Sequence, residues 1–466
     1  MPTVAAEGAT AAARYTPPTP RRPKRPMSPL VALFKARKNL LGIWHEGAFE
    51  KFIMQTRLPG RAVVIVNGVD AIKRVFLDNH DNYDPKSPQM RKALEPLLGD
   101  GLFVSDGEVW RRRRAMVAPA IAAAQLPNYA PLMVACAEEA AARWDSLGDG
   151  AGVDALQEMA VLTARIIGRT VFGDGVSDEE AARVVRGFSD YQAVVEQTDL
   201  LAMLGGPRWL HSGAPGPRAK TAADEVQGMV DMILARANAS VSDMRLAASL
   251  LASAQEVEDD PAAAVRNEAN VLFMAGHETT ANALAWTWSL LAMAPDVEGR
   301  MHEELAAVLG GRTPTLGDFN RLPYTRAVFE EALRLYPPVP ILSREARGAD
   351  TLRGKPIKGG DIIIIAPWLV HRHKAYWTDP DAFAPERFLP GAAEKPPKFA
   401  YIPFSGGARV CLGARFGLVE AVLCLATLAQ RFRLRPPPGA LFAPEIDCRL
   451  TLRPKGGLPM TLERRS

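Results

Sequence analysis

The sequence predicts a mainly α fold with small β-sheets (α+β), and three observations support that prediction. Helix-forming Ala, Leu, Glu and Arg dominate the 466 residues, which favours helices over strands. The longest helical stretch covers residues 259–294, where Asp caps and Pro261 mark its start and Pro295 follows its end. Strand-like runs are short and sparse, at residues 61–66 and between residues 340 and 370.

The composition divides the chain into a Pro/Arg-rich N-terminal arm, residues 1–40, and a single domain, residues 41–466. The arm holds eight Lys or Arg and one acid, so the net charge of +4 leaves the domain close to neutral. A neutral domain gives no electrostatic support for nucleic-acid binding. Six prolines between positions 17 and 29 predict an arm that is partly disordered and solvated, with contact to RNA or anionic lipid as the alternative.

Within the domain, the residue pattern predicts the order of the elements. Residues 69–79 are expected to form a helix, and helical patterns run through most of 107–240. Residues 81–106 are expected to be irregular with apolar patches, and residues 376–410 are expected to be coil. A Gly/Pro-rich break at residues 200–218 predicts a mobile lid between two helices.

Cysteine usage and hydropathy bear on the cellular compartment. Four cysteines, at positions 136, 411, 424 and 448, are scattered and form neither a disulfide framework nor a zinc spacing. The N-terminus lacks the apolar core of a signal peptide, and no apolar run is long enough to cross a bilayer. We therefore expect a cytoplasmic protein without a transmembrane segment.

The most informative segment is Phe404-Ser-Gly-Gly-Ala-Arg-Val-Cys-Leu-Gly413. Its glycines allow a tight turn, and the helix predicted to follow places Cys411 at a helix N-terminus, where negative charge is favoured. Each residue has a role if the sulfur is a thiolate ligand of heme iron: turn amides donate to the sulfur, Arg409 pairs with a propionate and Phe404 covers the sulfur. An ordinary buried thiol is the alternative, and it is the expected state of Cys424.

A second motif, Ala275-Gly-His-Glu-Thr-Thr280, lies inside the long predicted helix. Ala275 and Thr279 share one face, and the small Ala275 and Gly276 leave room beside the helix. Thr279 is expected to donate to a carbonyl one turn earlier, and Glu278 is expected to connect this hydroxyl to solvent. Space and a local proton donor suit bound dioxygen; a helix kink or a plain helix contact is the alternative.

Together these motifs resemble those of the cytochrome P450 superfamily. Its heme-binding signature is matched without a gap at Phe404, Gly407, Arg409, Cys411 and Gly413. The resemblance implies a triangular prism with a long central helix over the heme. It also implies that Cys411 is the metal ligand, that Glu278 is a proton relay and that Thr279 stabilises activated dioxygen, with Ala275 and Gly276 lining the heme side of the helix.

The resemblance extends to charged residues elsewhere in the chain. It implies that the heme propionates are held by Trp110, Arg114 and Arg344. It implies a buried structural network made by Glu331, Arg334 and Arg387. Residues 111–113 are all arginine; they are either a solvated face or a positive surface that attracts an acidic electron donor.

The expected activity is that of a soluble, bacterial-type monooxygenase with heme b (iron protoporphyrin IX). It would insert one atom of O2 into a hydrophobic small-molecule substrate, by hydroxylation or epoxidation, and reduce the other atom to water. Electrons from NAD(P)H would come from a separate ferredoxin with its reductase, or from a flavodoxin, and the protein is expected to be a monomer. The alternatives are a peroxygenase or rearrangement enzyme on the same fold, and a non-catalytic heme-thiolate sensor.

By the same resemblance, the substrate pocket is expected to draw on five mostly apolar segments. They are residues 81–106, residues 190–215, Phe273 with Met274, Val339 to Leu342, and Gly456 to Pro459. The sequence leaves the identity of the substrate open.

Overall fold

The computed structural model describes most of the chain. The described residues are 14–58, 60–173, 177–194, 217–239, 246–393, 395–439 and 441–465. Most of the predicted lid, residues 200–218, lies outside these ranges.

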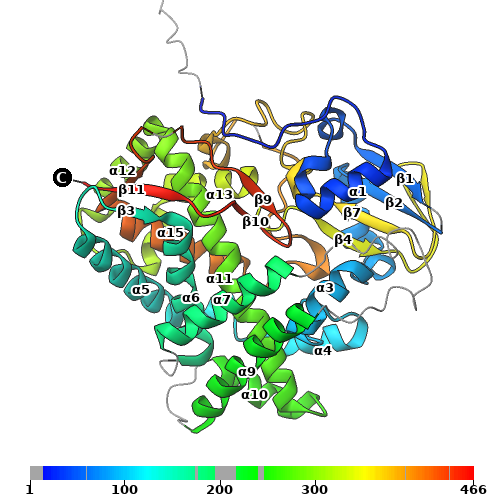
Figure 1. Ribbon diagram of the computed structural model, residues 1–466, viewed down its shortest axis with the longest axis horizontal. Helices are drawn as coiled ribbons and strands as arrows, with labels where there is room; N and C mark the ends of the chain where they lie inside the picture. The colour runs from blue at the N-terminus through cyan, green and yellow to red at the C-terminus, as the bar shows by residue number, and fades with distance from the viewer. Residues whose placement is uncertain are drawn as a thin grey trace, which may run out of the picture.

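Helices form the bulk of the molecule, as the composition predicted (Figure 1). The α-helices of the first half are α1 (Pro29–Lys38), α2 (Val69–Lys73), α3 (Pro88–Leu98), α4 (Gly107–Val117), α5 (Leu126–Leu147), α6 (Ala155–Phe172), α7 (Asp178–Val194) and α9 (Pro217–Ala239). The second half contributes α10 (Leu246–Val257), α11 (Pro261–Met293), α12 (Pro295–Leu309), α13 (Pro323–Leu335), α14 (Pro367–Val370) and α15 (Ala414–Ala429).

The long predicted helix is α11, which runs through the middle of the molecule (Figure 1). Its start is fixed by Asp260, whose side chain accepts from the Ala263 N–H, and by Pro261 in the first turn. Its 33 residues span about 50 Å at the usual helical rise. A Cβ on Gly276 would lie 2.7 Å from Ile167 of α6, so the missing side chain lets these two helices pack closely.

The strands form small sheets. Their bounds are β1 (Ile53–Leu58), β2 (Arg61–Val66), β3 (Gly152–Asp154), β4 (Leu342–Glu345), β5 (Asp350–Leu352), β6 (Lys355–Ile357), β7 (Ile362–Ile365), β8 (Phe432–Arg435), β9 (Ile446–Cys448), β10 (Leu452–Pro454) and β11 (Pro459–Arg464). The largest sheet has the order β1-β2-β7-β4, in which β2 and β7 are parallel and the other pairs antiparallel. Smaller sheets have the orders β3-β11-β8, β9-β10 and β5-β6.

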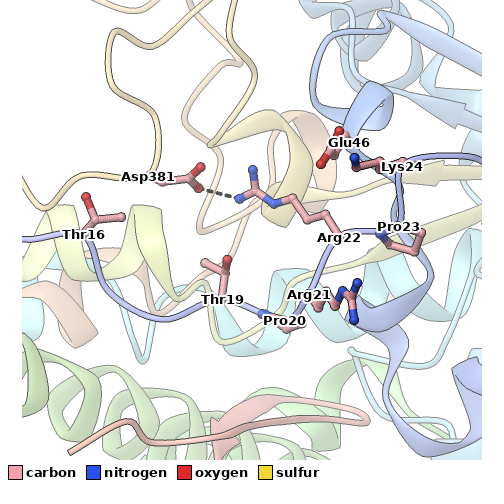
Figure 2. Close-up of a pocket in the computed structure, with 9 residues that line it drawn as sticks. All are labelled: Thr16, Thr19, Pro20, Arg21, Arg22, Pro23, Lys24, Glu46 and Asp381. Carbon is pink, nitrogen blue, oxygen red and sulfur yellow. Dashed lines mark hydrogen bonds and ion pairs between the residues drawn. The ribbon is translucent and has the colours of Figure 1, made fainter.

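Part of the N-terminal arm packs against the domain, where the composition had predicted a solvated tail. Arg22 pairs with Asp381 at 2.5 Å, and the Tyr15 carbonyl accepts from the Phe383 N–H at 2.8 Å. Figure 2 shows this stretch along the edge of a surface groove of about 500 Å³. Backbone hydrogen bonds and two ion pairs, Arg14–Asp379 and Arg22–Asp381, join residues 14–28 to the domain, interactions that a proline-rich composition does not reveal.

Two further expectations can be compared with the structure. Residues 81–106 are not irregular throughout, because α3 forms within them; Ser87 caps this helix and Pro88 opens it. The hydropathy expectation holds for the part of the chain that the structure describes, where no helix is both long and apolar enough to cross a membrane.

Candidate heme-binding site

Cys411 lies in a tight loop that runs from Ser405 and Gly407, two residues with a positive φ, to the start of α15. Its N–H donates to the Phe404 carbonyl at 2.9 Å. Gly407 has φ +67°, and a Cβ there would overlap the Phe76 carbonyl. Both the backbone conformation and the lack of space therefore exclude a side chain at this position. Ser405 has φ +63° although it is not a glycine, a strained conformation of the kind that concentrates at functional sites.

The sulfur of Cys411 opens onto an internal cavity of about 250 Å³. The Cys411 side chain is exposed towards this cavity, and desolvation by the surrounding protein raises the pKa of the thiol. A backbone hydrogen bond from Gly413, the N-cap of α15, and the charge of Arg114 lower the pKa in part. The sequence predicted that the sulfur is ionised when it ligates heme iron, favoured by turn amides and by the helix terminus. Desolvation has a larger effect on the pKa of the thiol than the Gly413 amide or Arg114, and a bound metal ion would deprotonate it.

The predicted distal motif lines the same cavity. Ala275, Gly276 and Thr279 all line its wall, and the Thr279 hydroxyl donates to the Ala275 carbonyl at 2.6 Å. This is the hydrogen bond that the sequence predicted for Thr279, and it weakens the helical ladder locally. Thr280, one residue on, also lines the cavity, so two hydroxyls of α11 stand within the space that Cys411 faces.

Glu278 is anchored by a residue that sequence reasoning missed. The Thr451 hydroxyl donates to Glu278 Oε1 at 2.6 Å, and Thr451 is buried beside the start of β10. The sequence predicted that Glu278 would lead towards solvent. The structure shows it held against the β9-β10 hairpin, a contact between positions 173 residues apart that no local spacing could reveal.

The four cationic or aromatic residues assigned to the propionates do meet at this cavity. Trp110, Arg114, Arg344 and Arg409 line it. Trp110 lies between two guanidinium groups, at 4.1 Å from that of Arg409 and 5.6 Å from that of Arg114. Arg409 also pairs with Asp84 at 2.7 Å, so its position is fixed by the protein itself.

Lys86 completes this cluster, and no pattern in the sequence indicated it. Its ammonium lies 4.8 Å from the Phe103 ring, and its backbone pairs with Arg344 in an isolated β-bridge. Burial, followed by the charges of Arg344 and Arg409, holds the pKa of Lys86 well below its usual range. Burial likewise lowers the pKa of Arg344 to about 10.

These features fit a heme. Lys86, Arg114, Arg344 and Arg409 line the cavity, whereas Glu420 is the carboxyl that lines it, and burial raises the pKa of Glu420 well above its usual range. The cavity therefore presents an excess of desolvated positive charge, which two heme carboxylates would neutralise. The small residues Ala275 and Gly276 of α11 and the Cys411 sulfur line the same cavity, which leaves space for a flat ligand between them.

The predicted structural network is present beneath the cavity. Arg334 donates to both oxygens of Glu331 at 2.7 Å, and both side chains are 0% exposed. Arg387 Nε lies 3.5 Å from Glu331 Oε1. Arg334 also donates to the carbonyls of His371 and Ala382, so the pair connects α13 to the chain that leads towards the Cys411 loop.

The substrate-pocket expectation holds for some segments and fails for others. Met90, Leu102 and Phe103 line the cavity, together with Val339 and Leu342. Phe273 instead packs on Phe172 and His277, and neither it nor Met274 is among the lining residues. Gly456 to Pro459 do not line the cavity, because this turn lies against Asp154; residues 195–215 lie outside the described ranges.

The three consecutive arginines of α4 point in different directions. Arg111 is exposed and pairs with Glu108, and Arg112 approaches Glu258 at 3.6 Å. Arg113 is buried, 3.1 Å from Asp100. The alternative of a solvated face is therefore wrong for Arg113, because successive residues of a helix face different sides.

Comparison with known proteins agrees with this site. The cytochrome P450 family model matches residues 22–458. Cyclooctatin synthase of Streptomyces melanosporofaciens is 34% identical over 92% of this chain and 92% of its own length. Cyclooctat-9-en-7-ol 5-monooxygenase of the same organism is 35% identical over 89% of this chain and 88% of its own. Protein LUTEIN DEFICIENT 5, chloroplastic, of Arabidopsis thaliana is 30% identical over 87% of this chain and 71% of its own length.

The matched range contains the Cys411 loop, the distal motif of α11 and the cationic cluster, so the residues that build the cavity lie in the shared part of the chain. The chain belongs to the cytochrome P450 family of heme-dependent oxidoreductases.

Proposed function

We propose that this cytochrome P450 is a heme b monooxygenase that hydroxylates or epoxidises an uncharged hydrophobic molecule, with electrons from a separate redox protein. One observation carries the proposal: the Cys411 sulfur and the Thr279 hydroxyl face one cavity. A sulfur ligand on one side and a proton-bearing group on the other are what oxygen activation at a heme needs.

The chain's own groups would hold the cofactor. Cys411 ligates the iron, and the Gly413 amide donates to the sulfur and tunes it. Lys86, Arg344 and Arg409 neutralise the propionates. Bound heme supplies the activation of dioxygen, whereas the protein supplies charge, orientation and a site shielded from water.

Thr279 and Glu278 would deliver protons. The Thr279 hydroxyl donates its single proton to the Ala275 carbonyl at the cavity wall, and rotation of the hydroxyl away from that carbonyl would let it donate to a ligand. Glu278 precedes Thr279 by one residue. Its carboxylate accepts a hydrogen bond from the Thr451 hydroxyl, which fixes the orientation of the Glu278 side chain. This arrangement supports a relay in which Thr279 delivers a proton and Glu278 restores it.

The apolar wall supports an uncharged substrate. Leu102, Phe103, Val271, Leu272 and Val339 line the cavity, so shape and apolar contact would govern placement. The name of one relative gives it cyclooctat-9-en-7-ol as the molecule it oxidises. We propose a compound of that general kind, a largely hydrocarbon ring system.

The exposed surface next to Cys411 supports docking of an acidic electron donor. Val410 is 38% exposed, and Arg114 donates to its carbonyl at 3.1 Å. Arg111 and Arg112, at 54% and 44% side-chain exposure, add positive charge that would steer a ferredoxin or a flavodoxin. The choice between these donors, the monomeric state and the cytoplasmic location stay predictions.

A binding screen tests the proposal. Ferric protein is titrated with uncharged hydrocarbons and with fatty acids, and the spin-state change of the heme is followed. We expect spin-state changes with the uncharged set, and then product formation with ferredoxin, ferredoxin reductase and NAD(P)H. Turnover with peroxide and none with ferredoxin would instead favour a peroxygenase, and binding confined to fatty acids would contradict the proposed substrate class.

A further inference from the structure

The segment between α3 and α4, residues 99–105, lies directly on α11. Gly101 faces this helix so closely that a Cβ there would come within 2.6 Å of Val271 Cγ2 and 3.2 Å of the Asn267 carbonyl. The Asn267 side chain donates to Asp100 at 2.8 Å. The segment is therefore fitted to one particular stretch of α11, two turns before the distal motif.

A buried carboxyl of α11 holds the backbone of this segment. Glu268 is 0% exposed, and its Oε1 accepts from the Leu102 N–H at 2.8 Å. Arg113 lies 3.9 Å from the same oxygen and also approaches Asp100 and Glu258. Leaving such a buried group without its partner is costly, so the contact strongly restrains where Leu102 can lie.

Leu102 and the next residue form part of the cavity wall. Leu102 and Phe103 line the cavity together with Val271, Leu272 and Ala275, which occupy the next two turns of α11 after Glu268. The hydrogen bond from the Leu102 N–H to Glu268 thus fixes one part of the wall, Leu102 and Phe103, relative to the adjoining part on α11. The side chain itself is not among the residues that line the cavity.

We infer that Glu268 is a positioning residue for substrate selection, which clamps residues 99–105 onto α11 and so sets the shape of the Leu102–Phe103 wall. The inference rests on the proposed function in one respect, that this cavity receives the substrate. It assigns the selectivity of the cavity partly to a residue that never touches the substrate.

Amide hydrogen exchange of the heme-loaded protein tests the clamp directly. In Glu268→Leu, we expect the Leu102 amide to exchange about tenfold faster or more, since a hydrogen bond to a carboxyl is lost. Glu268→Gln should retain protection because its amide oxygen can accept the same N–H. The matched control is Glu258→Gln, which alters the same charge cluster without touching residues 99–105.

Two azoles of different size test the effect on the wall. Imidazole and 4-phenylimidazole both ligate heme iron and shift its Soret band, but only the larger one extends towards the wall. We expect Glu268→Leu to change the ratio of their dissociation constants about fivefold or more, with imidazole itself unaffected. Glu268→Gln and Glu258→Gln should keep the wild-type ratio.

Gly101→Ala provides a second route if Glu268→Leu does not fold. It pushes the same segment away from α11 and leaves the acid cluster intact, so the azole ratio should change in the same way. A wild-type ratio in Gly101→Ala, or wild-type ratio and exchange in Glu268→Leu, would overturn the inference. If neither azole shifts the wild-type Soret band, the proposed function fails, whereas the Leu102 exchange rate still decides the clamp.

Discussion

At the residue scale, the Cys411 loop passes so close to Phe76 that Gly407 has no room for a side chain. Gly407→Ala adds a methyl group that overlaps the Phe76 carbonyl, at φ +67°. The backbone strain alone costs about 1–3 kcal/mol, so we expect lower stability and a low heme-to-protein absorbance ratio. Gly148→Ala is the matched control, because Gly148 has φ +88° with nothing within 4 Å of the added Cβ; equal heme loss in both variants would contradict the steric argument.

Thr279 is the second residue whose chemistry can be isolated. Thr279→Ala removes the hydroxyl and leaves Ala275 and the cavity in place, so heme and substrate should still bind. Without the proton donor, we expect the yield of product per electron consumed to fall at least about tenfold, with peroxide released instead. Thr279→Ser keeps a hydroxyl and should restore much of the coupling; unchanged coupling in Thr279→Ala would argue against the relay.

At the element scale, the Glu331–Arg334 pair attaches α13 to the segment that carries Arg387. Arg334→Ala removes the nearer partner of a fully buried carboxylate and leaves it with Arg387 at 3.5 Å; breaking a buried pair in this way typically costs about 3–5 kcal/mol. We expect a drop of that size in the free energy of unfolding, measured by urea denaturation of the heme-loaded protein. The control is Arg300→Ala, because Arg300 and Glu386 form an exposed pair worth about 1 kcal/mol or less. Similar losses of unfolding free energy in Arg334→Ala and Arg300→Ala would mean that burial does not increase the contribution of the Glu331–Arg334 pair to stability.

The contact between α11 and residues 99–105 should make stability depend on pH. The pKa of Glu268 is raised from 4.5 to about 8, mainly by burial and also by Asp100 and Glu258, against the Leu102 amide and Arg113. The folded protein therefore holds a proton that the unfolded chain releases, so this contribution is full below pH 4.5 and is lost as pH rises through about 8.

Glu268→Gln cannot titrate, so its free energy of unfolding relative to wild type should rise as the pH increases from 4.5 to about 8. We expect the difference in unfolding free energy to change by up to roughly 1.4 kcal/mol per pH unit. Parallel wild-type and Glu268→Gln stability curves would show that Glu268 is not protonated in the folded protein.

Local patterns in the sequence were sufficient for elements whose causes are local. The Asp caps and Pro261 predict α11 to within two residues at its start, and the glycines around Cys411 predict its turn. The Glu331–Arg334 pair follows from helical spacing. What the sequence could not supply are partners distant along the chain: Thr451 for Glu278, Arg344 beside Lys86, and Asp381 for Arg22.

Burial is the other property that spacing does not reveal. Three adjacent arginines look alike in the sequence, yet Arg113 is buried while Arg111 is exposed. The Cys411 thiol is a second case: its side chain is exposed to the cavity, yet desolvation by the surrounding protein raises its pKa against the Gly413 amide and Arg114. In both cases the surroundings of the side chain decide, and only the packed molecule defines them.

At the scale of the whole molecule, the fold brings one cavity together from distant parts of the chain. The Cys411 loop, the centre of α11, the start of α4 and the strand β4 all contribute to its wall. Figure 1 shows α11 passing through the centre, between the mainly helical part and the β1-β2-β7-β4 sheet. A rigid helical frame of this kind can hold a ligating sulfur and a proton donor at a fixed separation.

The carbon monoxide spectrum of the reduced protein tests the central claim, that Cys411 ligates heme iron, most directly. Wild-type protein loaded with heme should give a ferrous carbonyl Soret band at the long wavelength characteristic of a thiolate ligand, and Cys411→Ala should lose that band. A wild-type protein that takes up no heme, or whose band lies at the shorter wavelength of an imidazole ligand, would contradict the account.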